Sequence, residues 1–358
     1  MVHTATLICQ TITSEEYTAF VARAGKDGVK WYRSTKEAVL ELYKDIGVRV
    51  SVRKEFSQEY KGYIVVCRVN FHRLVSPLDV AGVYTHGEYE AMRVTFDNIM
   101  TVYGLPTLER YIVNRIDYCV NIVTPYAAEY IKLMQKGNKP YNLTIPYDKK
   151  NHERYQKEGS VYYHSTAYDK RKKSTGAYTI NFYDKYAQKE SEGLSGKDLE
   201  PYQNILRIEV QCHSPKVDTL KKKFQLWNKS PKLMLSSEIS RAVLHEAVLR
   251  VAGTGDYYRR AEALSMIEAL PCRGATKENI QKIMDEIGIQ YGSVWRARQK
   301  LVKDTQELKE EQFRNAMNKL KEIGVNPVTI GNSRKVRGLP KRAGLPNVWK
   351  LYEEQYGG

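Results

Sequence analysis

Two carboxylates stand in segments where polar and apolar residues alternate. Asp117 comes two residues after Arg115, and Glu209 comes two residues after Arg207. Because successive side chains of a strand point to opposite faces, each carboxylate would share a strand face with its arginine. Carboxylates that meet in one site are typical ligands of a hard cation such as Mg²⁺ or Mn²⁺. The spacing therefore indicates a metal site flanked by basic side chains.

Two further segments could add a nucleophile and another ligand. Tyr183 and Lys185 share the polar face of one expected strand, and His72 would lie on the polar face of another. A metal can polarise a phosphodiester, cations can neutralise its charge, and a tyrosine oxygen can attack phosphorus. Tyr147 and Tyr168 stand in equivalent Tyr-Asp-Lys triplets, so the local sequence does not select one nucleophile.

Structural roles would explain the same residues without any chemistry. Solvent-facing Arg, Asp and Glu on antiparallel strands commonly form cross-strand salt bridges that stabilise the sheet. An isolated histidine such as His72 can equally be structural. Both interpretations stay open at this level. The structural one predicts that Asp117 and Glu209 matter only for stability.

An α+β fold, with a mostly antiparallel sheet and flanking helices, would position these side chains. Alternating apolar residues predict strands at residues 4–11, 48–53, 62–73, 109–123, 160–168, 178–183 and 205–213. From residue 236 onward, apolar residues follow helical spacing instead. We therefore expect an α+β domain over residues 1–230, a helical C-terminal domain over 231–330 and a basic tail over 331–358. Within this tail, we expect residues 332–350 to form an extended arm.

The chain of 358 residues is strongly basic. It holds 57 Lys and Arg against 41 Asp and Glu, which gives a formal net charge of +16. An excess of this size points to a polyanionic partner, with nucleic acid as the first choice. The 27 tyrosines fit such a partner, because tyrosine rings can stack on bases.

Basic and aromatic residues interleave in one stretch of the chain. The residues that we expect to contact DNA are Tyr162, Tyr163, Lys170, Arg171, Lys172 and Lys173, together with Arg115 and Arg207 from the strands. In such a surface the charges face phosphates and the rings stack under bases of a single strand. A solvated, charged loop is the alternative interpretation of this stretch.

Several classes of protein do not fit the sequence. No apolar run approaches the roughly 18 residues of a membrane span, so we expect no membrane partner. The five cysteines are widely spaced and include no Cys-x-x-Cys pair. We therefore expect reduced, mostly buried thiols in a cytoplasmic protein rather than a disulfide framework or a zinc site.

Three short motifs occur in a characteristic order. They are N-R-I-D-Y-C-V at residues 114–120, T-I-N-F-Y-D-K at 179–185 and L-R-I-E-V at 206–210. Their order and spacing resemble the rolling-circle replication initiators of filamentous phages, the gene-two nicking proteins. A looser resemblance extends to the Rep_trans plasmid initiators and to related relaxases. The resemblance covers roughly residues 60 to 215.

The resemblance assigns roles to residues of these motifs. Tyr183 would be the nucleophile, and Lys185 would favour its phenolate or the scissile phosphate. Asp117 and Glu209 would support Mg²⁺ or Mn²⁺. The histidine-hydrophobe-histidine metal motif of many rolling-circle nucleases is absent from the sequence, so His72 is the candidate for an additional ligand.

The activity implied by the resemblance is that of a metal-dependent endonuclease and strand transferase that initiates rolling-circle DNA replication. It would nick and rejoin origin DNA at one site on one strand through a 5′-phosphotyrosine, with residues 1–230 as the nicking domain. Its partners would be single-stranded or hairpin origin DNA and the helicase and replication machinery of a bacterial host cell. A homodimer is compatible with this activity.

Two other functions stay open. One is a non-catalytic DNA-binding regulator of replication or transcription, which would bind DNA without forming a covalent adduct. The other is a conjugative relaxase, which would use the same chemistry on a different mobile element. A tyrosine recombinase fits less well, because its arrangement of Arg, His-x-x-Arg and a late Tyr is not visible in the sequence.

Overall fold

A computed structural model describes the chain except for residues 28, 33–36, 42–45, 57–60, 141, 146, 149–152, 155–158, 166–175, 290–291, 331–343 and 358. The chain divides into two compact units, each built from separate stretches. The first comprises Met1–Asn121, Ser165–Ile180 and Ile208–Leu244, and the second comprises Ile122–His164, Asn181–Arg207 and His245–Gly358. The domain boundaries expected at residues 230 and 330 stay a prediction.

The strands of the larger sheet follow the order β2-β3-β4-β5-β1-β6-β12-β11-β10-β7, and β8 pairs with β9. Their bounds are β1 (Val2–Ile12), β2 (Lys30–Tyr32), β3 (Glu37–Leu40), β4 (Val48–Phe56), β5 (Lys61–Asn70), β6 (Ile112–Val123), β7 (Leu143–Thr144), β8 (Tyr147–Asp148), β9 (Glu153–Arg154), β10 (Ser160–Ser165), β11 (Tyr178–Asp184) and β12 (Ile205–Cys212). The pairs from β2 through β5 to β1 and β6 are all antiparallel.

The α-helices are α1 (Ser14–Ala24), α2 (Phe71–Val75), α3 (Tyr89–Val102), α4 (Ala127–Gln135), α5 (Lys185–Ser191), α6 (Ser214–Lys223), α7 (Pro231–Met234), α8 (Ser237–Val251), α9 (Arg260–Glu268), α10 (Gly274–Gly288), α11 (Val294–Arg298), α12 (Glu310–Glu322) and α13 (Val348–Tyr356). Short 3-10 helices cover Gly25–Asp27, His86–Glu88, Leu108–Arg110 and Gly196–Tyr202, and a π-helical turn covers Gln299–Asp304. This arrangement confirms the α+β fold with flanking helices and a helical C-terminal region.

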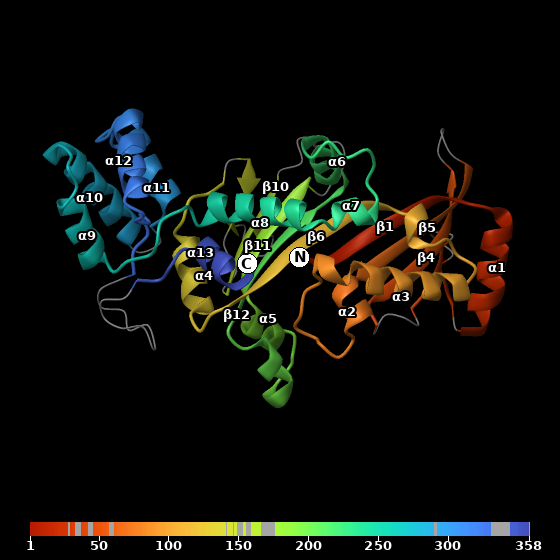
Figure 1. The fold of residues 1–358 in the computed structure, drawn as a ribbon. Helices are drawn as coiled ribbons and strands as arrows, with labels where there is room; N and C mark the ends of the chain where they lie inside the picture. The colour runs from red at the N-terminus through yellow and green to blue at the C-terminus, as the bar shows by residue number, and fades with distance from the viewer. Residues whose placement is uncertain are drawn as a thin grey trace. The chain divides into compact units, whose positions relative to one another are not determined.

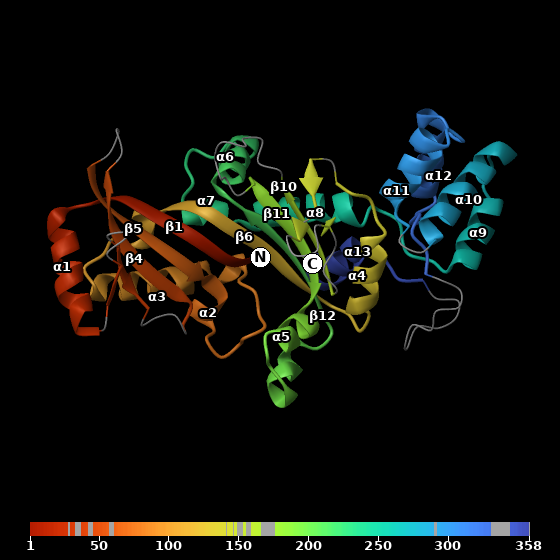
Figure 2. The same ribbon diagram turned by 180° about the vertical axis from the view of Figure 1, so that it is seen from behind.

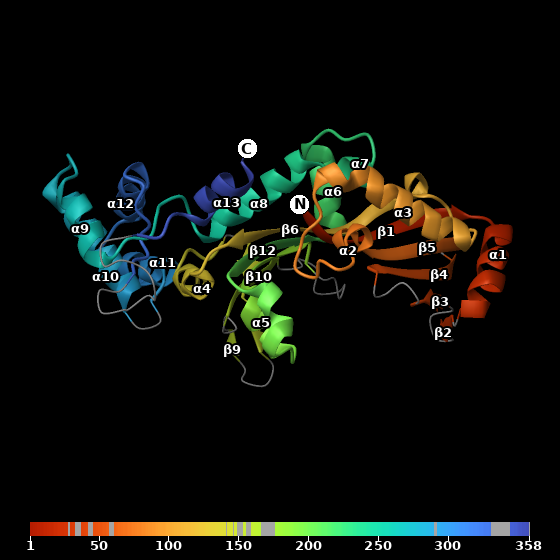
Figure 3. The same cartoon turned by 60° about the horizontal axis from the view of Figure 1, so that its bottom comes forward.

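One face of β5 is buried in the core of the first unit, and the other face becomes polar toward the end of the strand. Val65, Cys67 and Val69 are buried, whereas Arg68 is exposed and Asn70 is half-buried. Helix α2 contacts β1 and β5, and α3 packs on α2. Figures 1 and 3 show both helices running beside these strands. The alternation of faces predicted for this strand is therefore confirmed over residues 65–70, whereas Ile64 is buried although it lies on the face of Arg68.

The strand expected over residues 62–73 ends three residues early. β5 stops at Asn70, whose side-chain oxygen accepts a hydrogen bond from the Arg73 N–H and caps α2. His72 is therefore a buried residue of a helix. The prediction that His72 occupies the polar face of a strand is wrong. Asparagine is a strong N-cap, and it starts a helix where the apolar alternation alone would continue a strand.

Helices α9, α11 and α12 each contact α10 in the second unit (Figures 1 and 2). The apolar residues of α10 recur at helical spacing and are buried: Ile280, Ile283, Met284 and Ile287. Its residues Ile280, Ile283 and Ile287 therefore form one apolar stripe facing the neighbouring helices. The expectation of a helical C-terminal region rested on this same spacing.

The end of the expected tail is helical. Asn347 caps α13 by accepting a hydrogen bond from the Trp349 N–H at 2.9 Å, and Val348 and Tyr352 of this helix are buried. The expectation of an extended arm over residues 332–350 is wrong for residues 348–350, which belong to α13. The basic residues of the tail that precede residue 344 lie outside the described part of the chain.

Two general expectations can be compared with the structure directly. All five cysteines are free thiols and four of them are buried, as predicted. Within the described part of the chain, none of the helices combines the length and apolar character that crossing a bilayer requires.

Candidate active site

Asp117 lies at the centre of a polar cluster in the first unit. Its side chain is almost fully buried on β6. Arg115, two residues earlier on the same strand face, donates from Nε to Oδ1 at 2.9 Å and from Nη2 to Oδ2 at 3.0 Å. Thr4 of β1, opposite Asp117 in the ladder, donates its hydroxyl to Oδ2 at 2.5 Å. The carboxylate thus forms a bidentate ion pair with Arg115 and accepts a hydrogen bond from the Thr4 hydroxyl.

A bulge in β1 brings a second residue to this cluster. The β1–β6 register shifts between Val2 and Thr4, so His3 is the extra residue of the ladder. A bulge locally re-aims the side chains of a strand. Nδ1 of His3 lies 3.9 Å from Oε2 of Glu209 on β12, while Thr4 contacts Asp117. Sequence reasoning did not select His3, because a bulge leaves no clear signal in the apolar alternation.

The two carboxylates influence one another. Glu209 is buried, and Gln211 donates a hydrogen bond to its Oε1 at 2.8 Å. Burial raises the pKa of Asp117, the Glu209 charge raises it further, and Arg115 and Thr4 oppose both effects. The net shift is upward even though Arg115 makes a close ion pair. A positive charge added near these two carboxylates would therefore be favourable.

His213 completes the group of charged and titratable side chains. It follows β12, is partly buried and occupies the N-cap position of α6, where its side chain makes no capping hydrogen bond. Burial lowers the pKa of His213, the Arg115 charge lowers it further, and Asp117 opposes this effect. A neutral imidazole is a possible metal ligand or proton acceptor. His213 comes four residues after Glu209, so the alternation expected over residues 205–213 gives both residues the same strand face and is the sequence signal that identifies His213.

The chemistry of the two carboxylates fits a magnesium ion, but the described residues do not provide a complete set of protein ligands. Mg²⁺ is commonly bound by one or two carboxylates, with waters and substrate phosphates completing its shell. Among the described residues, however, no group of three or more His, Cys, Asp and Glu side chains is placed to hold a metal. His72 instead has Nε2 3.0 Å from Oδ2 of Asp79 and Nδ1 4.0 Å from Oε1 of Glu88. The metal-ligand roles of Asp117, Glu209 and His72 stay predictions.

Tyr183 and Lys185 lie where β11 passes into α5 in the second unit. Asp184 ends the strand, and its Oδ1 accepts hydrogen bonds from two backbone N–H groups in the first turn of α5. This cap makes Lys185 the first residue of the helix. Because the strand ends at Asp184, the prediction that Lys185 shares a strand face with Tyr183 is wrong. Both Tyr183 and Lys185 are nevertheless buried.

The ammonium group of Lys185 lies between aromatic rings. Its Nζ is 5.5 Å from the ring centroid of Tyr183 and 5.9 Å from that of Tyr202. It also donates a hydrogen bond to Oε1 of Gln188 at 2.9 Å. Because only 4% of Lys185 is exposed, water screens this charge weakly. A cation is thus held against the ring of Tyr183. The catalytic roles of Tyr183 and Lys185 stay predictions.

The residues expected to bind DNA have different surroundings. Tyr162 is half-exposed and can stack on a base, whereas Tyr163 is buried. Arg207 is only 1% exposed, and burial of this kind does not favour a contact with DNA phosphates. Arg115 keeps 30% of its side chain exposed. Lys170, Arg171, Lys172 and Lys173 lie outside the described residues.

Comparison with known proteins gives no family for this chain. No family model matches it, and neither a curated protein nor a solved structure does so.

Proposed function

We propose that the protein is a DNA-nicking strand transferase that initiates rolling-circle replication, with Tyr183 as the nucleophile. The observation that carries this proposal is the buried ammonium group of Lys185 beside the Tyr183 ring. A tyrosine with an ordinary pKa near 10 is a weak nucleophile at neutral pH. A weakly screened cation favours the negative phenolate and so makes attack on a phosphodiester easier.

The proposed reaction is a transesterification that balances without any co-reactant. The Tyr183 oxygen forms a bond to phosphorus while the bond from phosphorus to the 3′ oxygen breaks. The phenol proton ends on the 3′ oxygen, directly or through solvent. The protein keeps a 5′-phosphotyrosine, and the DNA gains a 3′-OH that a polymerase can extend. Because the new ester retains the bond energy, reversal can rejoin the strand.

Asp117 and Glu209 are the residues that would hold Mg²⁺ or Mn²⁺ in this proposal. Such an ion would neutralise charge on the scissile phosphate. Burial raises the pKa of Asp117, and the Glu209 charge adds to this effect. This direction supports the role, because a bound cation would stabilise the charged form of the carboxylate. Arg115 would contribute a further positive charge from the same strand face.

The test uses the full-length protein, Mg²⁺ or Mn²⁺, and a pool of single-stranded oligonucleotides of random sequence. Oligonucleotides labelled at the 3′ end should give a labelled protein band on a denaturing gel, since the protein keeps the 5′ phosphate. Oligonucleotides labelled at the 5′ end should give only shortened free DNA. Tyr183→Phe should abolish both products and leave DNA binding intact.

Tyr186→Phe is the matched control, because Tyr186 is a tyrosine of the same segment, three residues after Tyr183. The control should retain the adduct. An adduct that persists in Tyr183→Phe would rule out Tyr183 as the nucleophile.

A non-catalytic DNA-binding protein is the second candidate. One observation favours it: both oxygens of the Asp117 carboxylate already accept hydrogen bonds from Arg115 or Thr4, as in a purely structural ion pair. This function predicts salt-dependent binding with no labelled protein band under any of the conditions above.

A further inference from the structure

Three arginines of the first unit lie in one row across the sheet. Arg49 of β4 is opposite Arg68 of β5, Arg68 is opposite Thr6 of β1, and Thr6 is opposite Arg115 of β6. Residues opposite one another in antiparallel strands project to the same face. The row therefore presents its charges on the polar face of the sheet.

The described acidic residues balance the positive charges of this row only in part. Like charges directly opposite one another destabilise a sheet. Arg49 has a weak partner in Glu41, with Nε 3.7 Å from Oε1. Within the described part of the chain, the guanidinium groups of Arg68 and of nearby Arg73 have no anionic partner. A sheet that keeps such a repulsive pair gains from a bound anion.

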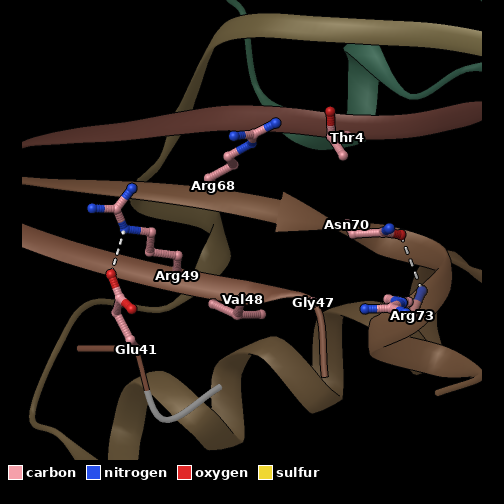
Figure 4. A pocket seen from close by; sticks show the side chains of 8 residues that line it. All are labelled: Thr4, Glu41, Gly47, Val48, Arg49, Arg68, Asn70 and Arg73. Atoms are coloured by element: carbon pink, nitrogen blue, oxygen red, sulfur yellow. Dashed lines mark hydrogen bonds and ion pairs between the residues drawn. The ribbon is translucent and has the colours of Figure 1, made fainter. Parts of the chain in front are cut away.

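A pocket of about 290 Å³ opens beside the row, and Figure 4 shows the side chains that line it. Its lining includes Arg49, Arg68 and Arg73, with Asn70 between the last two in the chain. Gly47 lines it as well, with a φ of 91° that favours glycine. A Cβ at Gly47 would lie 2.7 Å from the Asn70 carbonyl oxygen, so a larger residue would disturb this wall.

The pocket adjoins the carboxylate cluster through one residue. Thr4 lines the pocket and is opposite Asn70 on one side and Asp117 on the other. Its hydroxyl donates to the Asp117 carboxylate. A row formed by Asn70, Thr4 and Asp117 thus runs next to the arginine row on the same face. An anion held by the arginines would lie beside the cluster that contains Asp117.

We propose that this pocket binds backbone phosphates of a single-stranded nucleic acid, with Arg68 and Arg73 as the principal contacts. The planar guanidinium group matches the geometry of phosphate oxygens and can donate two hydrogen bonds at once. The arginine row continues to Arg115 and so gives the strand a track of positive charge. That the strand is origin DNA rests on the proposed function, whereas the phosphate site itself does not.

The test measures binding of a fluorescent 20-nucleotide oligo-dT by anisotropy, in EDTA so that metal-dependent cleavage cannot occur. Loss of one phosphate contact lowers the slope of log K against log salt by about 0.7 for single strands, which is about fivefold in affinity at 0.1 M salt. Arg68→Gln and Arg73→Gln should each show this loss. The double variant should bind about 25-fold more weakly than the unchanged protein.

Arg314→Gln is the matched control, because Arg314 is an exposed arginine of α12 and loses the same charge. It should leave the slope within error of the unchanged protein. Binding of Arg68→Gln and Arg73→Gln that equals this control would overturn the proposal. So would equally tight binding of thymidine monophosphate, because the site would then recognise a free phosphate rather than a strand.

These outcomes are separable from the failure of the proposed function. Weaker binding by the two arginine variants, together with no covalent adduct from the unchanged protein, would leave the phosphate site in place and remove the nicking activity. If the adduct forms normally while the two arginine variants bind like the control, the nicking activity would stand and the phosphate site would be ruled out.

Discussion

Replacement of Arg115 by Met should destabilise the fold through the charge that it leaves behind. Asp117 is 2% exposed. Its carboxylate accepts two hydrogen bonds from Arg115 and one from Thr4. Breaking a fully buried ion pair costs about 3–5 kcal/mol, because the remaining charge is unpaired. Since 30% of the Arg115 side chain is exposed, water weakens the pair. We therefore expect a loss of about 2–3 kcal/mol at pH 7.

The pH dependence of this loss identifies its cause. The pKa of Asp117 is already above 3.8 in the folded protein, first because of burial, and removal of Arg115 would raise it further. A carboxyl with a raised pKa binds its proton more tightly in the folded state, so stability falls as pH rises through that pKa. The penalty should be complete above the folded pKa and should vanish as pH falls toward 3.8.

Urea denaturation at several pH values, followed by circular dichroism, measures the effect. Adding Asp117→Asn to Arg115→Met should recover stability at pH 7, because the unpaired charge is removed. Arg110→Met is the control, since its pair with Glu16 is more exposed and should cost less than about 1 kcal/mol. A loss in Arg115→Met that matches this control, or that does not change with pH, would refute the reasoning.

Two other substitutions test separate parts of the molecule. Gly82→Ala should lower the thermal midpoint, because a Cβ at this position would overlap the His72 ring and the Asp79 carboxylate and break their hydrogen bond; an unchanged midpoint would contradict this packing. Lys185→Gln should slow formation of the covalent adduct about tenfold or more at pH 7 and less at higher pH, since it removes the cation beside the nucleophile. Lys189→Gln, whose ammonium group lies over Tyr202, is the matched control, and equal rates in the two variants would remove the role of Lys185.

The sequence is sufficient to predict the faces of strands but not where strands end. Alternation correctly separates Arg68 and Asn70 from the buried residues Val65, Cys67 and Val69 of β5. It fails at His72, because a single capping hydrogen bond from Arg73 to Asn70 decides between a strand and a helix. Such a local contact competes with the apolar pattern, and the pattern carries no information about it.

Contacts between distant parts of the chain are a second limit. Asp117 and Thr4 are 113 positions apart, and a bulge at His3 sets which residues of β1 meet the carboxylates. A one-residue shift in register moves every side chain to the other face, so the partners of Asp117 depend on the bulge. The neighbouring arginine row was missed for the same reason. It consists of residues from three strands whose order along the sheet is not contained in any one segment.

Arg115 belongs to both features of this sheet face, and this explains how they can coexist. Asp117 would repel a phosphate in the adjoining pocket, because both are negative. Arg115 pairs with Asp117 and also ends the arginine row, so it places a positive charge between the carboxylate and the track. Loss of DNA binding in Arg115→Met would therefore have two causes. The first is the lost contact between Arg115 and a phosphate, and the second is the repulsion between Asp117 and that phosphate, which Arg115 no longer offsets. Only the second is relieved by Asp117→Asn, so the double variant separates the electrostatic role of Arg115 from its direct contact with DNA.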